Sequence, residues 1–132
     1  MTQHYSETIK QHYHHPLNSG KLDNADFVAE QVNPLCGDET KVYIKFIIVE
    51  NSRGRGNFPQ SDLVIQDISH ETRGCMICVA SASAVSEYAR GKKLSEIKKL
   101  GIKQISKLLN VQISSARASC ANLIHAALKK LG

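Results

Sequence analysis

The sequence predicts an α+β fold in which helices pack on one three-stranded antiparallel sheet. Three observations support this prediction. An amphipathic helix opens the chain, three segments between residues 26 and 71 alternate as strands do, and the rest of the chain has helical periodicity. The chain has 132 residues, of which 42% are hydrophobic, which is enough for one core. We therefore expect residues 1–132 to form a single domain.

Residues 2–14 are the expected first helix, because apolar side chains recur there every three to four positions. Pro16 and Gly20 end this helix. Apolar residues then alternate in three expected strands, residues 26–32, 41–50 and 63–71. A loop rich in Gly and Asn, residues 51–60, joins the second strand to the third.

The second half of the chain is expected to be helical. A turn at residues 72–74 leads into a helix that begins at Cys75 or Met76 and ends at Gly91. Two shorter helices are expected, over residues 94–100 and 103–109. A last helix begins at Ser114 or Ser115, either of which can act as its N-cap, and runs to Leu131.

The charge and composition exclude several classes of partner. Lys and Arg outnumber Asp and Glu by 17 to 12, and the excess lies in lysine doublets that we interpret as solvated helix faces, suited at most to an acidic protein. The seven aromatic residues do not interleave with basic ones, so no nucleic-acid partner is expected. No secretory signal and no membrane-spanning run are present, so we expect a cytoplasmic protein with no membrane partner.

Four polar side chains are candidates for one metal or cluster site. The tight polar loop Asn33–Asp38 places Cys36 two residues before Asp38. Cys75 and Cys120 each lie at the start of an expected helix, where N–H groups and the helix dipole stabilise a thiolate. Three sulfurs and one carboxylate oxygen suit zinc, and mostly thiolate ligation also suits an iron–sulfur cluster. We therefore predict that these four residues converge.

Other interpretations of the same residue types remain open. The cysteines are too widely spaced for a zinc finger and could instead fill the core. Cys75 and Cys78 have the C-x-x-C spacing of a redox pair, but the antiparallel strands before them favour a buried Cys78. His12, His14 and His15 cluster at a helix end, where polar caps are more common than metal ligands.

Three motifs in order along the chain resemble those of the IscU/NifU/SufU iron–sulfur cluster assembly proteins. Asn33–Asp38 is similar to the family's N-P-x-C-G-D motif, and residues 74–83 are similar to its G-C-x-x-x-x-A-S-x-S motif. Cys120 falls where the third cysteine of the family lies. The opening helix and the turn at Gly91 are similar as well, so the resemblance covers nearly the whole chain.

The resemblance implies an IscU/SufU-like α+β fold and a scaffold, not a turnover enzyme. It implies that Cys36, Asp38, Cys75 and Cys120 bind zinc at rest, and that they take up iron and a transient 2Fe–2S cluster during assembly. Cys36 and Cys120 are the candidate persulfide acceptors, and Asp38 is the labile ligand. The implied partners are a cysteine desulfurase, which supplies sulfur, and apo iron–sulfur proteins, which receive the cluster.

Departures from the IscU branch leave the branch undecided. Ser119 stands where IscU has a histidine, and residues 113–117 stand where it has an L-P-P-V-K motif, which counts against an IscU-type chaperone partner. Ser119 with Arg117 resembles SufU, but SufU has an extra segment before its third cysteine. The leading hypothesis is a cluster assembly scaffold. The alternatives are SufU-like zinc-dependent sulfur transfer and a zinc-stabilised interaction domain without sulfur chemistry.

Overall fold

The computed structural model describes residues 6–34, 37–48 and 63–130. Its elements, in chain order, are α1 (Glu7–His14), β1 (Phe27–Asn33), β2 (Asp38–Ile48), β3 (Leu63–Arg73), α2 (Met76–Ala89), α3 (Leu94–Lys98), α4 (Ile102–Leu109), a 3-10 turn (Ser115–Arg117), α5 (Ala118–Ala121) and α6 (Leu123–Lys129). Among the described residues, no helix is long and apolar enough to cross a membrane.

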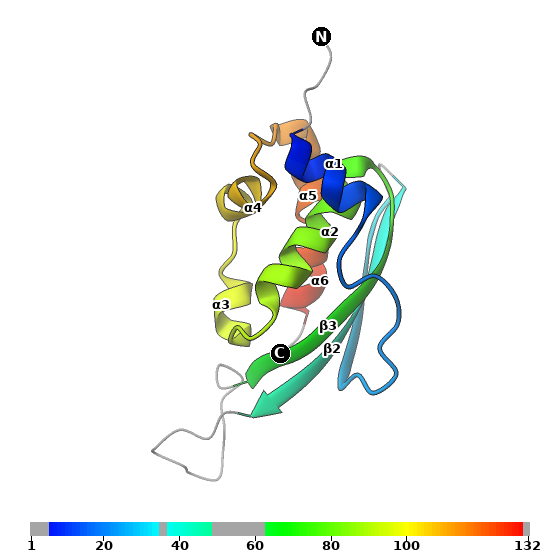
Figure 1. Cartoon of the computed structure of the whole chain (residues 1–132), viewed down its shortest axis with the longest axis vertical. Coiled ribbons are helices and arrows are strands. Elements are labelled where there is room, and N and C mark those ends of the chain that lie inside the picture. The colour runs from blue at the N-terminus through cyan, green and yellow to red at the C-terminus, as the bar shows by residue number, and fades with distance from the viewer. Residues whose placement is uncertain (1–5, 35–36, 49–62, 131–132) are drawn as a thin grey trace.

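The three strands form one antiparallel sheet in the order β1-β2-β3, as the sequence predicts (Figure 1). All three strands extend beyond a predicted end: β1 continues to Asn33, β2 begins at Asp38 instead of residue 41, and β3 continues to Arg73. Asn33 and Asp38 form the last pair of the β1–β2 ladder, and the Gly37 N–H donates to the Asn33 carbonyl at 2.9 Å. Asp38 is therefore a strand residue, although the sequence placed it in a loop.

Helices cover one face of the sheet, and α2 lies at the centre of the helical layer (Figure 1). It contacts β3 on one side and α1, α4, α5 and α6 on the others. The run Ala80–Ser86 is entirely buried. Small Ala and Ser side chains allow neighbouring helices to approach closely, and the Ser81 hydroxyl donates directly to the Ala121 carbonyl of α5. Packing around α2 thus fixes the position of α5 against the start of α2.

The ends of two predicted helices differ from the structure. Ser6 is the N-cap of α1 and accepts from the Ile9 N–H at 3.1 Å, whereas the predicted helical residues 2–5 lie outside the described part of the chain. The last helix was predicted as continuous, which is wrong: a 3-10 turn precedes α5, and Asn122 separates α5 from α6 with ψ near 3°. Asn has low helix propensity because its side chain competes for backbone groups.

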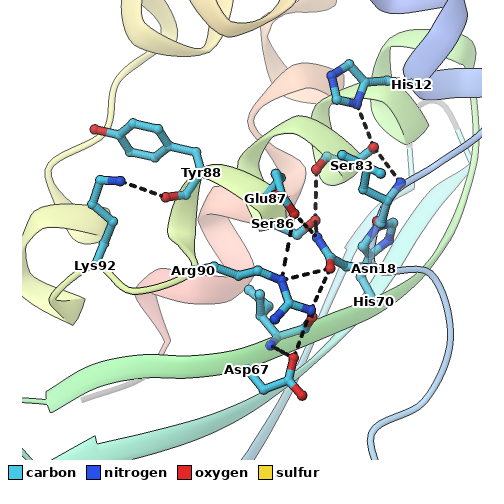
Figure 2. Close-up of polar contacts among 12 residues, drawn as sticks. His12, Asn18, Asp67, His70, Ser83, Ser86, Glu87, Tyr88, Arg90 and Lys92 are labelled. Carbon is cyan, nitrogen blue, oxygen red and sulfur yellow. Dashed lines mark hydrogen bonds and ion pairs between the residues drawn. The ribbon is translucent and has the colours of Figure 1, made fainter.

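A polar network fastens the segment after α1 to α2 and β3 (Figure 2). Arg90, the C-cap of α2, donates to Asp67 on β3 at 2.8 Å and to the Asn18 Oδ1 at 2.6 Å. The Asn18 Nδ2 donates in turn to the Ser86 hydroxyl at 3.0 Å. His12, one of the clustered histidines, is hydrogen-bonded to the Ser83 hydroxyl at 2.6 Å. These contacts place His12 in the packing of α1 on α2.

His70 is a buried histidine on β3, only 1% exposed. Its Nε2 donates to the Leu17 carbonyl at 3.0 Å, so its Nδ1 accepts from the Thr72 hydroxyl at 2.8 Å. Thr40 on β2 donates to the same Thr72 hydroxyl at 2.8 Å. Burial lowers the pKa of His70 below its usual 6.5, and the Leu17 carbonyl opposes this shift only in part. The folded protein thus favours the neutral imidazole.

We expect the free energy of unfolding to fall as the pH drops below about 6.5. In that range the unfolded chain binds a proton at His70 that the folded chain does not, which contributes a slope of up to about 1.4 kcal/mol per pH unit. Urea unfolding over a pH series measures this slope, and His70→Gln should reduce it. His14→Gln removes an exposed histidine and serves as the control. An unchanged slope in His70→Gln would contradict the assignment.

Candidate metal centre

The pleat of β2 directs Asp38 toward the helices. Alternate residues of a strand point to opposite faces of the sheet. Thr40, Val42 and Ile44 on β2 are buried beneath the helical layer, and Asp38 belongs to the same alternating set. Its side chain is accordingly 1% exposed. The first residue of β2, a strand that supplies core residues, is therefore a carboxylate that faces the start of α2.

Cys75 is the N-cap of α2, with extended backbone angles, so the helix begins at Met76, the second of the two starts that the sequence predicts. Its N–H donates to the Asp38 Oδ1 at 3.0 Å. A helix N-terminus carries unpaired N–H groups and positive partial charge, both of which favour a neighbouring anion. The beginning of α2 thus orients the carboxylate and favours a thiolate at Cys75.

Cys120 completes a cluster of three candidate ligands. It is the third residue of α5 and is 1% exposed. One ligand atom from each of Asp38, Cys75 and Cys120 lies within 4.8 Å of the other two. The structure therefore brings together three of the four predicted site residues. The fourth, Cys36, lies outside the described residues.

The donor atoms fit a metal ion. Asp38 Oδ2 is buried and has no hydrogen-bond partner within the described residues. A buried carboxylate oxygen without a partner costs free energy, which an ion bound to it would offset. Zinc bonds of ~2.3 Å to sulfur and ~2.1 Å to oxygen correspond to donor separations of about 3.5–4 Å around a tetrahedral ion. The three donor atoms lie within 4.8 Å of one another, so each pair would need to approach by at most about one ångström to reach such separations.

Gly74 provides the room for the Asp38 carboxylate, a role that the sequence analysis missed. An ideal Cβ at Gly74 would lie 2.2 Å from Asp38 Oδ1, and the φ of Gly74 is +153°. Any larger residue would strike the carboxylate and would also adopt an unfavourable backbone conformation. The signal in the sequence was the glycine directly before Cys75. Its contact with Asp38, however, joins residues far apart in the chain.

A second contact that the sequence analysis did not predict links the β1–β2 hairpin to α5. The Asn33 side-chain amide donates to the Ser119 hydroxyl at 3.2 Å. Asn33 closes the hairpin that carries Cys36, and Ser119 directly precedes Cys120. The sequence analysis noted Ser119 only because it stands where IscU has a histidine. In the structure, Ser119 connects α5 to the hairpin by this hydrogen bond.

The other candidates from the sequence do not join this cluster. Within the described ranges, Asp38, Cys75 and Cys120 are the group suited to hold a metal, and the histidines of α1 and its C-cap are not part of it. Cys78 is 2% exposed and packs in the core, as expected for a buried cysteine. Cys75 and Cys78, both described, are not joined by a disulfide.

Comparisons with known proteins agree with this geometry. A sequence profile of the NifU-like N terminal domain matches residues 4–131. The iron–sulfur cluster assembly scaffold protein IscU 1 of Archaeoglobus fulgidus is 32% identical over 126 residues, which cover 96% of this chain and 72% of that protein. The scaffold protein IscU of Escherichia coli is 32% identical over 131 residues, covering 95% and 88% of the two chains.

A solved structure has the same fold. The SufU protein of Fervidobacterium islandicum superimposes with a TM-score of 0.73 at 25% identity, covering 96% of this chain and 94% of that one. Three cysteine motifs in order, an antiparallel sheet covered by helices and a profile match along nearly the whole chain all lead to one assignment. The chain belongs to the NifU-like N-terminal domain family.

Proposed function

We propose that this protein is a scaffold on which iron–sulfur clusters are assembled and from which they are passed to other proteins. One observation carries the proposal: ligand atoms of Asp38, Cys75 and Cys120 lie within 4.8 Å of one another. Relatives named as cluster assembly scaffolds, each matched along most of its length, support the same function. The implied partners are a cysteine desulfurase and apo iron–sulfur proteins, and the implied compartment is the cytoplasm.

Cys36 is the proposed fourth ligand. It precedes Asp38 by two residues, so chain length alone keeps the two Cα atoms within about 7 Å. Three thiolates and one carboxylate form a four-coordinate zinc site at rest. When bound, zinc supplies positive charge that keeps the thiols deprotonated.

Sulfur enters through a cysteine of the site. A thiolate of Cys36 or Cys120 attacks the terminal sulfur of a desulfurase persulfide. A new S–S bond forms as the persulfide's own S–S bond breaks, and the desulfurase thiolate leaves, so no net oxidation occurs. Iron is the second substrate, and an external reductant supplies two electrons for each sulfane sulfur that becomes sulfide. Cys120 is buried, so sulfur delivery to it requires local opening of the site.

Anaerobic reconstitution with a cysteine desulfurase, cysteine, iron and a reductant tests this function. We expect visible absorption from a 2Fe–2S cluster in the unmodified protein and its loss in Cys36→Ala, Cys75→Ala and Cys120→Ala. Cys78→Ala is the matched control, because Cys78 belongs to the core and should leave the spectrum unchanged. A spectrum that survives every one of the three site substitutions would exclude these ligands.

The alternative is SufU-like sulfur transfer, in which one thiolate leaves zinc to accept sulfane sulfur. The likeness to a SufU structure and the presence of Ser119 favour it. Persulfide relay from desulfurase to acceptor without any cluster in the same reconstitution would support the alternative over the scaffold. If the thiols of the zinc-stripped protein resist mild alkylation, both sulfur hypotheses fail and a zinc-stabilised interaction domain remains.

Asp38→Ala should slow release of the bound cluster to apo-ferredoxin about tenfold, which corresponds to ~1.4 kcal/mol in the barrier. The reason is that the carboxylate is the exchangeable ligand, whereas the thiolates hold the cluster more firmly. Stopped-flow measurement of cluster transfer gives the rate. Asp23→Ala, at an exposed carboxylate in the segment between α1 and β1, is the control. Equal transfer rates in Asp38→Ala and the unmodified protein would remove this role.

Gly74→Ala should weaken binding of zinc or cobalt at least about tenfold, in the range of substitutions that disturb ligand orientation. The added methyl group would displace the Asp38 carboxylate. Cobalt absorption and chelator competition measure the affinity. Gly91→Ala is the control for backbone strain, because Gly91 has a φ of +77° and no atom within 4 Å of its ideal Cβ.

The double variant Asp38→Ala with Gly74→Ala separates the two causes. With the carboxylate removed, Gly74→Ala should cost little further metal affinity. Full additivity of the two substitutions would instead mean that Gly74 acts through the backbone and not through Asp38.

A further inference from the structure

The charge of the chain is divided between its two parts. Residues 88–132 contain ten Lys and Arg but one acid, Glu96, a balance of +9. Residues 1–87 contain seven basic and eleven acidic residues, a balance of −4. The net charge of +5 therefore conceals a strongly basic C-terminal third and a slightly acidic remainder.

The structure gathers part of this positive charge on two neighbouring helices. Five lysines lie on α3, on α4 or directly beside them, and we call them the lysine face: Lys93, Lys98, Lys99, Lys103 and Lys107. On α4, Ile105 and Leu109 are buried while Lys103 and Lys107 are exposed on the opposite side. Figure 1 shows α3 and α4 on the same side of α2, with α3 beside the start of β3.

Ion pairing differs between the two parts of the molecule. The ion pairs among the described residues join Glu30 to Lys41, Glu39 to Arg73, and Arg90 to both Asp67 and Glu87. All of these pairs lie on the sheet or at the end of α2. None includes a residue of the lysine face. Glu30, Glu39 and Asp67 on the sheet thus have cationic neighbours, whereas the lysine face has no acidic partner of this kind in the described chain.

Beside the lysine face lies a groove whose lining includes Ser119, the residue before Cys120. The groove runs between the α3–α4 connection, at Leu100–Ile102, and the helices α5 and α6. Ser119, Asn122 and Lys129 line its other wall, and no carboxylate lines it. Ser119 directly precedes Cys120. A chain seated across the lysine face and this groove would therefore lie next to a proposed cluster ligand.

We propose that the lysine face is the docking site for an acidic surface of a protein that exchanges sulfur or cluster with this site. This inference rests on the proposed function, because the exchange requires a second protein next to Cys120. Complementary charge accelerates encounter and selects the partner more than it adds affinity. The face is suited to orient a short-lived complex that must separate after transfer.

Other occupants fit the face less well. The large hydrophobic residues exposed in the described chain, such as Val32 and Ile47, lie on the sheet or between α1 and β1, so this face offers nothing to insert into a membrane. Within the described residues, Tyr88 is the one aromatic beyond residue 87, and a stacking platform for bases needs more. A second copy would have to present the sheet carboxylates, of which Glu30 and Glu39 already have cationic partners.

Binding of a fluorescently labelled peptide of twelve Asp and Glu residues to the zinc-loaded full chain tests the proposal. We expect Lys99→Glu with Lys103→Glu to weaken binding at least about tenfold at low ionic strength, where surface charges are little screened. Lys21→Glu with Lys45→Glu makes the same change in net charge elsewhere and should weaken it less than about twofold. Amide NMR shifts should map to residues 93–107 and to the groove.

Three results would overturn the proposal. Equal loss in both double variants would mean that net charge, and not this face, binds the peptide. Tighter binding of a twelve-nucleotide oligothymidylate or of anionic phosphatidylglycerol vesicles to the same residues would assign the face to another class of partner. Charge-dependent self-association in sedimentation would assign it to a second copy. Chemical reconstitution with ferrous iron and inorganic sulfide needs no desulfurase, and it should be normal in the Lys99→Glu, Lys103→Glu variant, so failure of the scaffold function is detected separately.

Discussion

The contact between Asp38 and the start of α2 is the constraint on which the site depends. Asp38 points toward the helices because it follows the alternation of the core residues of β2. There its carboxylate accepts a hydrogen bond from the Cys75 N–H. Gly74 makes this approach sterically possible. The strand, the turn and the helix must therefore keep one relative position, and the small residues of α2 maintain it. The same packing brings α5 and its Cys120 against the first turn of α2.

The sequence predicted the elements well where local pattern decides them. Alternating apolar residues identified all three strands, and Gly91 ended α2 near the expected position. Residue chemistry and motif resemblance selected the site residues, of which the structure places Asp38, Cys75 and Cys120 together. Strand ends were less accurate, because pairing of Asn33 with Asp38 extends the ladder into what reads locally as a loop.

Long-range contacts account for what the sequence could not show. The space that Gly74 leaves matters only because Asp38, on another strand, enters it. The hydrogen bond from Asn33 to Ser119 joins opposite ends of the chain. No periodicity reports such contacts.

The environment of Asp38 also explains how a site can hold an ion and still release it. One carboxylate oxygen is held by a helix N-terminus, and the other is buried without a partner among the described residues. The unpaired oxygen favours binding, because an unsatisfied buried acceptor costs about 1–3 kcal/mol. The hydrogen bond from the Cys75 N–H to the first oxygen fixes the orientation of the carboxylate, which also favours binding. Exchange follows instead from the ligand type: zinc and iron in clusters prefer soft thiolates, so the oxygen of Asp38 is the ligand that an incoming group displaces more readily than the thiolates beside it.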